Sequence, residues 1–593
     1  MFPDIRHPRT YVSLILFALM FLLPLSLDSP FWTNLFVLLF VFSSLSVAWN
    51  IVGGFAGQLS LGHAVFYGIG GYAATLLTQD FGISPWFGMI VGALLSGLVA
   101  AVISYPTLRL KGPFFALATI AILEVVRLLV IHEESWTGGS SGISLPLSIG
   151  WKWMVFRDKT NYLIIAFVLF LLVLWASWII RKARLGHYLL AIREREDAAL
   201  AVGINTARVK TLAAVLSAML TSVVGTFHIT YLTFIDPASA FSLDLSIQIA
   251  MFALIGGMGT VAGPVAGTFL VLPIAELARA WLSGVGNGVH GLIYGVILVV
   301  VVLTIPHGLV GALGGYVERT ILARLPYLGR GNGERRAVQP LATGCVRGEQ
   351  PVLEASHLFK NFGGLRATHD VSLALYENEI LGIIGPNGAG KTTVFNQLSG
   401  FLRPDSGTVR MLERGGGWTS CRAPFQFAHK GLSRTFQIAQ PFTGLTVLEN
   451  IMLGAFIHTT DRRQAEAEAL AIAQQTGLAD QLQVEARSLT VGGMKRLEVA
   501  RALATRPRIL LLDEVMAGLN PTDIEKAIAM IRRIRESGVS VVMIEHMMQA
   551  VMALSDRIIV INEGQVLTSG TPREVVENPQ VIEAYLGKGY RHA

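Results

Sequence analysis

Long apolar runs fill most of the first 310 residues of this 593-residue chain. A helix that crosses a bilayer needs about 20 mostly apolar residues. The sequence therefore predicts an all-helical membrane domain of about ten spans. The predicted spans cover residues 11–27, 31–52, 58–78, 86–105, 113–131, 162–180, 211–231, 245–261, 264–282 and 290–306.

Two parts of this predicted membrane domain leave alternatives open. No small-residue cleavage site follows residues 11–27, so this run is interpreted as a retained first span rather than a cleaved leader. Gly256-Gly257-Met258-Gly259 and Pro264 separate the eighth and ninth runs, and they could instead mark a break within one long membrane region.

The composition changes along the chain. Charged residues make up only 15% of the whole and apolar residues 52%, which is outside the usual range for a soluble enzyme. After Gln350, however, the supply of charged residues is ordinary. We therefore predict a transmembrane domain over residues 1–312, a flexible basic linker over 313–350 and a soluble α/β domain over 351–593.

The basic residues follow membrane topology rather than nucleic-acid binding. The net charge is +7, but basic clusters such as Arg109-Leu110-Lys111 and Arg181-Lys182-Ala183-Arg184 flank apolar runs. Loops with excess Lys and Arg stay on the cytoplasmic side, so an even number of spans returns the C-terminal domain to the cytoplasm. The linker arginines are expected to lie against anionic membrane lipid. The two cysteines, Cys345 and Cys421, then fall in a reducing compartment, and we expect no disulfide.

Charged residues inside predicted spans are costly and therefore informative. Glu124 and Arg127 are three residues apart, as are Glu276 and Arg279, so each couple is expected to form an intramembrane ion pair on one helix face. Contact with a transported solute is the alternative. The lone His63 and His228 are interpreted as buried hydrogen-bonding groups rather than ligands.

The cytoplasmic loop 184–210 has the pattern of a short amphipathic helix that ends at Gly203, a residue suited to a helix C-terminus. Its mixed charges, from Arg193 to Asp197, favour contact with a soluble domain. The alternative is a helix that lies on lipid headgroups.

A phosphate-binding loop stands out in the soluble part. The apolar strand 380–384 leads into Gly385, Pro386, Asn387, Gly388, Ala389, Gly390, Lys391, Thr392 and Thr393. Glycines in such a loop let backbone N–H groups surround phosphates at the start of a helix. Lys391 is then expected to reach the β- and γ-phosphates of ATP, and Thr392 to bind Mg²⁺.

Two later strands supply the remaining chemistry. The run 509–514 predicts a buried parallel strand that ends in Asp513 and Glu514. Asp513 suits Mg²⁺, and Glu514 can orient or deprotonate an attacking water. The apolar run 539–544 delivers His546 to the same carboxyl edge of the sheet, where it can sense the γ-phosphate.

With these motifs in this order, residues 351–593 resemble the nucleotide-binding domain of ATP-binding-cassette transporters. The resemblance implies a helical insertion near residues 445–500, adenine stacking by Phe362, and contact of Gln437 with both Mg²⁺ and the permease. It also implies that residues 517–520 cross a dimer interface. The segment that completes the opposite monomer's ATP site usually reads L-S-G-G-Q. Here it is Leu489-Thr490-Val491-Gly492-Gly493, so a hydroxyl is kept as Thr490, the fourth-position glycine is kept as Gly492, and the glutamine is replaced by Gly493.

The chain most resembles the branched-chain amino-acid importers of that family. The motifs that carry this resemblance are Phe362-Gly-Gly364, residues 513–521, residues 569–587, Trp49-Asn-Ile51, Leu108-Arg-Leu-Lys-Gly112, Thr137-Gly-Gly139, Gly203-Ile-Asn205 and Gly256-Gly-Met-Gly259. The resemblance implies an inner-membrane importer with ATP and Mg²⁺ as cofactors. Its implied partners are a periplasmic solute-binding protein, a second permease subunit and a second ATP-binding subunit. Family members usually keep permease and ATPase as separate chains, so this fusion departs from the pattern.

The substrate remains open among branched-chain amino acids, urea, amides and aromatic carboxylates. An exporter is disfavoured because the membrane motifs resemble importers. A non-transporting regulator or nucleic-acid-handling ATPase is disfavoured by the attached spans. The altered signature favours a heteromeric complex, because a homodimer would place it in both ATP sites.

Overall fold

The computed structural model describes residues 20–26, 29–107, 110, 112–146, 148–281, 295–296, 299, 308–311, 347–413 and 415–586. Its contacts divide the chain into two compact units. The first contains residues 1–193 and 207–330, and the second contains residues 194–206 and 331–593. The predicted linker 313–350 lies almost wholly outside the described residues, and the domain bounds stay predictions.

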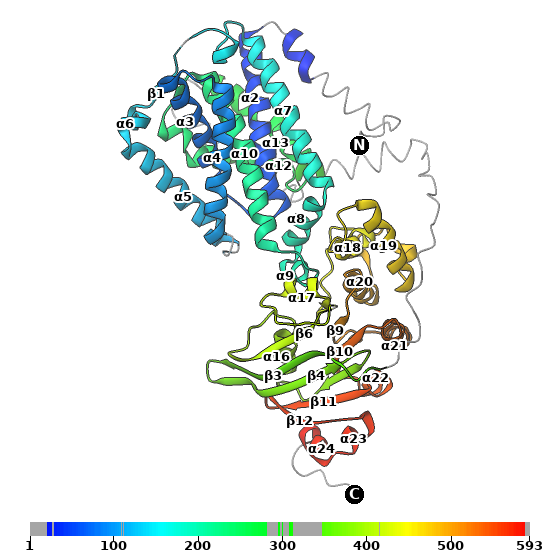
Figure 1. The fold of residues 1–593 in the computed structure, drawn as a ribbon. Helices are drawn as coiled ribbons and strands as arrows, with labels where there is room; N and C mark the ends of the chain where they lie inside the picture. Colours follow the sequence, from blue (N-terminus) through cyan, green and yellow to red (C-terminus); the bar gives the residue numbers. More distant parts are fainter. Residues whose placement is uncertain are drawn as a thin grey trace. The chain divides into compact units, whose positions relative to one another are not determined.

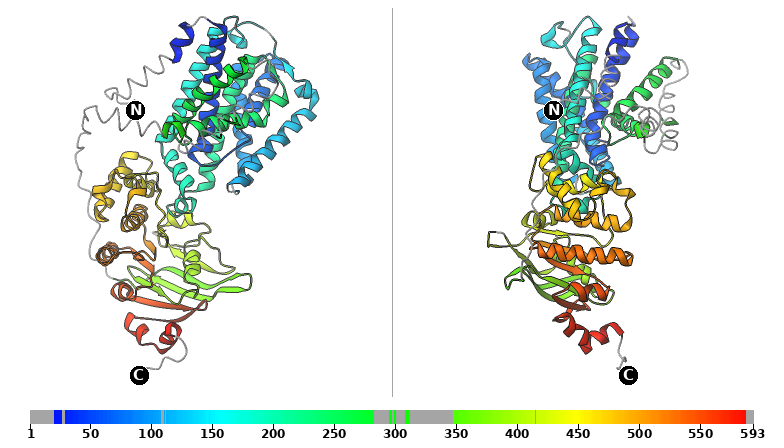
Figure 2. Two further views of the ribbon diagram at one scale, coloured as in Figure 1. Left: turned by 180° about the vertical axis from the view of Figure 1, so that it is seen from behind. Right: turned by 90° about the vertical axis from the view of Figure 1, so that its right-hand side faces the viewer.

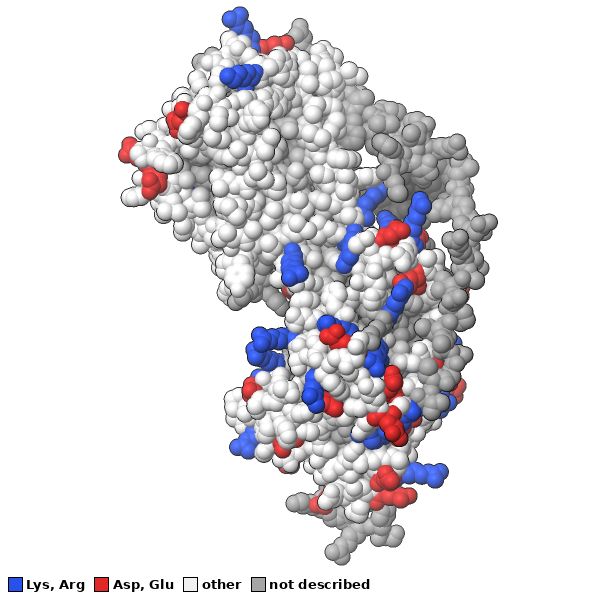
Figure 3. Space-filling model, in the orientation of Figure 1, with Lys and Arg blue, Asp and Glu red and all other residues white. Residues whose placement is uncertain are grey.

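The first unit is helical (Figure 1). Within the described residues, six helical segments are long and apolar enough to cross a membrane, namely 30–55, 85–107, 113–132, 159–182, 206–232 and 237–256. The corresponding elements are α2 (Pro30–Asn50) with the π-helical η1 (Ile51–Phe55), α4 (Pro85–Thr107), α5 (Pro113–His132), α7 (Lys159–Lys182), α10 (Thr206–Leu232), and α11 (Pro237–Ala240) with α12 (Leu243–Gly256). The visible face of this unit is largely uncharged (Figure 3).

Several predicted spans differ from the observed helices. The span predicted at 58–78 is the helix α3 (Ala64–Phe81), which starts six residues later because residues 56–63 form a non-helical loop. The run 245–261 ends as a helix at Gly256, and the non-helical residues 257–262 separate it from α13 (Gly263–Trp281). The predicted span 290–306 and most of 11–27 lie outside the described residues.

Buried polar contacts hold the loop 56–63 inside the helical unit. His63 lies between the hydroxyls of Ser60 and Ser217, each 2.9 Å from a ring nitrogen. Trp49 Nε1 donates to the Ser60 carbonyl at 2.7 Å. Non-helical backbone is tolerated at membrane depth only where protein or a cavity satisfies it. His63 is thus a buried hydrogen-bonding group, as predicted, and so is His228, which contacts the Tyr67 hydroxyl at 2.9 Å.

Of the two predicted membrane ion pairs, that of Glu124 and Arg127 is confirmed. Arg127 donates from Nε and Nη2 to the two Glu124 oxygens at 2.9 and 2.5 Å. The side chain of Arg279 lies outside the described residues, so the pair predicted with Glu276 stays a prediction.

The cytoplasmic loop contains two helices rather than the single one expected. α8 (Arg184–Glu194) and α9 (Glu196–Ala201) meet at Arg195, whose extended backbone interrupts the helix. Gly203 follows with φ +87°, a left-handed conformation that favours glycine and agrees with the predicted helix stop.

The second unit contains two sheets. β12 (Gln565–Gly570), β11 (Arg557–Asn562), β5 (Ile380–Ile384), β10 (Ser540–Ile544), β9 (Ile509–Asp513) and β8 (Leu432–Arg434) form a six-stranded sheet in that order. All neighbours are parallel except β11 and β12. β4 (Leu365–Tyr376), β3 (Pro351–Phe362), β6 (Ser406–Leu412) and β7 (Trp418–Thr419) form the second sheet.

Helices pack against the six-stranded sheet (Figures 1 and 2). A separate group of helices is inserted in the chain between β8 and β9. α18 (Val447–Ala455), α19 (Arg462–Gln475) and α20 (Val491–Leu503) pack on one another and confirm the helical subdomain expected near 445–500. β5, β9 and β10 are buried throughout, as continuous apolar strands of a covered parallel sheet should be.

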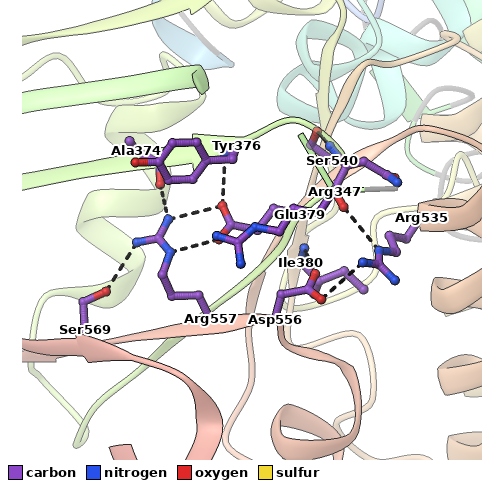
Figure 4. A network of polar contacts seen from close by, with 11 residues as sticks. Arg347, Ala374, Tyr376, Glu379, Ile380, Arg535, Ser540, Asp556, Arg557 and Ser569 are labelled. Carbon is purple, nitrogen blue, oxygen red and sulfur yellow. Dashed lines mark hydrogen bonds and ion pairs between the residues drawn. The ribbon is translucent and has the colours of Figure 1, made fainter. Parts of the chain in front are cut away.

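A buried carboxylate fixes the start of β5 (Figure 4). Glu379 is fully buried, and Arg557 donates to its two oxygens from Nε and Nη2 at 2.9 and 3.2 Å. Arg347 adds a contact at 3.1 Å, and the Tyr376 backbone N–H donates at 2.8 Å. This network lies at the end of β5 opposite to the phosphate-binding loop, so it anchors the strand that carries that loop.

Glu379→Ala should therefore destabilise the second unit by about 2–3 kcal/mol, because it leaves the partly buried Arg557 guanidinium and the Tyr376 backbone N–H without their acceptor. The measurement is thermal unfolding of the detergent-solubilised protein. Glu354→Ala removes a carboxylate that pairs with the half-exposed Arg410 and should cost less than about 1 kcal/mol. Equal shifts in the two variants would contradict the role given to Glu379.

Candidate ATP-binding and hydrolysis site

The phosphate-binding loop connects β5 to α16 (Lys391–Leu398). Gly388 and Gly390 have φ of +82° and +98°, and a Cβ on Gly390 would lie 2.3 Å from the Ala367 carbonyl. Only glycine fits there, so the loop can curl tightly before the helix and expose backbone N–H groups. The predicted strand–loop–helix setting is therefore present.

Lys391 is the first residue of α16 and folds back over the loop. Its Nζ donates to the carbonyls of Gly385 and Pro386 at 2.7 and 2.8 Å. Partial burial lowers the pKa of Lys391 below its ordinary value, and the Glu514 carboxylate opposes this shift. The ammonium group is thus held over the loop that is expected to receive phosphates.

Asp513, at the end of β9, is buried beside Arg434 at the end of β8. The two are 3.4 Å apart, and the Asp513 backbone N–H donates to Thr435 Oγ1 at 3.0 Å. Burial raises the pKa of Asp513, and the positive charge of Arg434 opposes that rise.

Arg434 is held from several sides at once. Its guanidinium carbon lies 4.9–5.1 Å from the ring centres of Phe395, Phe401 and Phe436. It also donates to Asn396 Oδ1 and Ser399 Oγ at 2.7 and 2.8 Å. Burial lowers the pKa of Arg434 to about 10, so it stays charged at neutral pH. Arg434 thereby links β8 to α16 and fixes the position of the Asp513 carboxylate.

Glu514 follows Asp513 with an unusual backbone. Its φ is +46°, a left-handed conformation that is costly for a residue with a Cβ. This bend lets its N–H donate to the Ile544 carbonyl at 2.9 Å, at the end of the neighbouring β10. Gln437 Nε2 donates to Glu514 Oε2 at 3.0 Å, and His546 Nδ1 lies 3.9 Å from the same oxygen. The structure thus brings together three of the residues predicted from separate motifs.

Lys495, on α20, was missed by the sequence analysis. Its buried ammonium group donates to the backbone carbonyls of Gln437 and Glu514 at 2.9 and 2.6 Å. It therefore joins the loop of Gln437 to the strand end of Glu514. The signal that identifies Lys495 is its burial within the mixed-polarity helix α20. Burial is not visible in the sequence, so the sequence analysis could not predict this residue.

The remaining predicted residues lie apart from this cluster. Phe362 ends β3 with half of its side chain exposed and a Lys360 ammonium 5.7 Å from its ring centre. Thr490 is the N-cap of α20, and its hydroxyl accepts a hydrogen bond from Gly493 N at 3.2 Å. A Cβ on Gly492 would lie 3.1 Å from Asp523 Oδ2. Residues 517–520 turn between Glu514 and α21 (Pro521–Glu536).

The donor set fits a hard cation. Thr392, Gln437 and Asp513 offer a hydroxyl, an amide and a carboxylate oxygen, and Mg²⁺ favours few protein oxygens together with phosphate and water. No cluster of three or more His, Cys, Asp or Glu residues that could hold a metal occurs in the described part of the chain.

Comparisons with known proteins match both parts of the chain. Residues 31–302 match the family described as "Branched-chain amino acid transport system / permease component". Residues 368–517 match "ABC transporter", and residues 565–591 match "Branched-chain amino acid ATP-binding cassette transporter".

Individual relatives match the second unit. The "High-affinity branched-chain amino acid transport ATP-binding protein LivG" of Salmonella typhimurium is 42% identical over 255 residues, covering 40% of this chain and 99% of the relative. BraF of Pseudomonas aeruginosa, a relative with the same description, is 41% identical over 255 residues, which again cover 40% of this chain and 99% of the relative. A crystal structure of a nucleotide-free ATP-binding cassette matches at 28% identity with a TM-score of 0.37, covering 40% of this chain and 100% of that chain.

The permease match and the two ATP-binding matches lie on one polypeptide in the order predicted from the sequence. The second unit binds and hydrolyses ATP, and the first places the chain in the inner membrane. The chain belongs to the ATP-binding-cassette importers of the branched-chain amino-acid type, with permease and ATPase fused.

Proposed function

We propose that this chain takes up branched-chain amino acids, at the expense of ATP, as half of a complex. The complex also contains a different permease subunit, a second ATP-binding subunit and a periplasmic solute-binding protein. The observation that carries the proposal is the presence of a branched-chain permease match and a branched-chain ATPase match on one chain. Alternative solutes on the same scaffold are urea, amides and aromatic carboxylates.

Each predicted residue has a task in hydrolysis. Lys391 and the N–H groups of residues 385–393 hold the phosphates, and Phe362 stacks on the adenine. Thr392, Gln437 and Asp513 hold Mg²⁺, which neutralises phosphate charge when it is bound. Glu514 accepts the proton of the attacking water, and His546 contacts the γ-phosphate. Thr490 and Gly492 face the ATP of the partner subunit.

Uptake into proteoliposomes tests the function. The assembled transporter is reconstituted with its solute-binding protein, and ATP-dependent uptake of labelled leucine, isoleucine and valine is compared with that of urea, an aliphatic amide and benzoate. We expect uptake of the three amino acids only. Uptake of one of the other compounds, without any of the amino acids, would contradict the substrate assignment and leave the importer assignment standing.

Lys495 is expected to act as a positioning residue for Glu514. Lys495→Met should lower kcat for ATP hydrolysis by about tenfold to a hundredfold with little change in KM, because small displacements of a reacting group are costly. Lys495→Arg keeps a cationic donor and should restore most of the rate. A loss of thermal stability with unchanged kcat would instead assign Lys495 a purely structural role.

The segment 194–206 is proposed to couple hydrolysis to transport, and its contacts within the second unit support this role. The Glu194 carboxylate accepts hydrogen bonds from Gly444 N and Thr443 Oγ1 at 2.8 and 3.2 Å. α9 packs against α17 (Pro424–Lys430), and the Asp197 charge opposes the lowering of the pKa of Arg434. Asp197 of this segment therefore interacts electrostatically with Arg434, the residue that holds Asp513.

Gly203→Val should uncouple the transporter. A Cβ at this position would lie 2.5 Å from Ile457 Cδ1, and φ is unfavourable for valine. We expect uptake to fall by at least about tenfold while basal ATP hydrolysis persists, because coupling rather than chemistry is disturbed. Gly416→Val is the matched control, since Gly416 has φ +88° and no neighbour within 4 Å of a Cβ. Equal uptake in the two variants would refute the coupling role.

A further inference from the structure

α5 is the membrane helix least covered by its own chain. Within the described residues, 17% of its apolar window is buried, against 39–94% for the other five candidate spans. Figure 1 and the left view of Figure 2 show α5 at the edge of the helical unit. Most of its surface must therefore meet something outside the described residues, either lipid or protein.

The exposed face of α5 carries charge near the middle of the span. Glu124 is the twelfth of 20 residues in α5, and its side chain is 50% exposed, while that of Arg127 is 30% exposed. Charged groups at this depth face protein or water rather than lipid, since hydrocarbon cannot solvate them. Their mutual ion pair reduces the cost but leaves oxygens and N–H groups open toward the outside.

The neighbouring helix α4 shows what a lipid face looks like in the same unit. It contains no charged residue. Its most exposed long side chains are all apolar or aromatic, namely Phe87, Ile90, Leu94, Leu98, Val102 and Tyr105. The two helices are thus similar in length and hydropathy, but only α5 presents an ion pair outward.

The exposed residues of α5 have the spacing of a helix-packing seam. Leu117, Ala121, Glu124 and Leu128 are separated by four, three and four residues and are all exposed. Residues at this spacing form one stripe along a helix, and a small residue such as Ala121 lets a second helix approach closely. The stripe therefore combines two leucines, a small residue and a polar centre.

A hollow lies beside the same helix. Its volume is about 490 Å³, and its lining includes Gln58, Leu61, Gly112, Phe115, Leu117 and Ile120. The amide oxygen of Gln58 is buried and accepts no hydrogen bond from any residue that the structure describes. The lining is mainly apolar, and the volume is large enough to receive a large side chain of a second helix.

We propose that the stripe Leu117–Ala121–Glu124–Leu128 of α5 is the surface on which the different permease subunit packs. This inference rests on the proposed heteromeric importer. The partner's facing helix is apolar at the levels of Leu117 and Leu128 and places a hydrogen-bonding side chain opposite the Glu124–Arg127 pair. The altered signature disfavours a second copy of this chain as the occupant.

Site-specific photocross-linking tests the surface. p-Benzoylphenylalanine replaces Leu117 or Leu128 on α5, or the equally exposed Leu94 or Leu98 on α4 as matched controls. The full chain is produced with its native partner subunits, irradiated in membranes and analysed by mass spectrometry. We expect the α5 positions to yield adducts with the second permease at least about tenfold more often than the α4 positions, because packed helices exclude lipid.

A charge test uses co-purification as its readout. Glu124→Leu combined with Arg127→Leu should leave the chain inserted, because the span becomes more apolar. It should reduce the second permease recovered with the chain about threefold to tenfold, because interhelical hydrogen bonds are lost. Glu124→Gln retains a hydrogen-bonding group and should reduce recovery less than the double change.

The remaining outcomes each overturn the proposal. Adducts of α5 only with lipid, with a second copy of this chain, or with the chain's own residues outside those described would exclude this interface. If the second permease co-purifies but its adducts form on α4, the inference fails while the proposed function stands. If active, transporting preparations contain no second permease, the proposed subunit composition itself is wrong.

Discussion

Glu514→Gln is expected to abolish ATP turnover while leaving ATP binding intact, with a loss of steady-state rate of about 10²–10⁴-fold, the range for removing a general base. The amide keeps the size of the side chain, but it cannot accept the proton of the attacking water. Gln437 Nε2, which donates to Glu514 Oε2 at 3.0 Å, can still bind the amide oxygen, so the local packing should survive. The measurement combines ATPase rates of the purified complex with nucleotide-binding titrations.

The control is Glu525→Gln, which changes an exposed glutamate on α21 and should leave both quantities unchanged. Near-normal turnover in Glu514→Gln would transfer the role of base to another group. His546, 3.9 Å from the Glu514 carboxylate, would then be the next residue to test.

The second large effect concerns the two ATP sites, whose lysines are expected to contribute unequally to ATP hydrolysis and uptake. Lys391→Ala should remove most ATP hydrolysis and uptake, because Lys391 serves the site that pairs an intact set of hydrolytic residues with the partner's signature. The matching lysine change in the partner ATPase should cost less. The site it damages is the one completed here by the altered segment Thr490–Gly493, which lacks the usual glutamine.

The comparison requires the assembled transporter, with each lysine changed separately and ATPase activity and uptake measured together. Equal losses from the two changes would refute the asymmetry. Full substrate-stimulated hydrolysis and transport by this chain alone, as a homodimer, would refute the heteromeric assembly as well.

The hydrolytic residues could be predicted because their chemistry follows from short segments. The strand 380–384 was predicted with the bounds that β5 has, and the strand predicted at 509–514 extends one residue beyond β9. In a parallel sheet the carboxyl ends of neighbouring strands meet, so Asp513, Glu514 and His546 had to converge once their strands were recognised. Mutual contacts of Gln437, Glu514 and His546 agree with that expectation.

Membrane spans were predictable for a related reason, since the length and apolarity of a helix are properties of consecutive residues. The start of α3 was not, because buried contacts decide where a helix can begin. The loop 56–63 stays non-helical while Trp49 and Ser217, on other helices, satisfy its polar groups.

What the sequence by itself determined is therefore local: the order of the two units, the phosphate-binding loop and the residue types at the strand ends. Only the tertiary structure decided which side chains support them. Lys495 reaches the Gln437 carbonyl across 58 residues of chain, and Arg434 reaches Asp513 across 79. The exposed pair on α5 likewise depends on which helix faces the rest of the unit leaves uncovered. Such contacts depend on burial and on distances between residues far apart in the chain, which no short sequence pattern encodes.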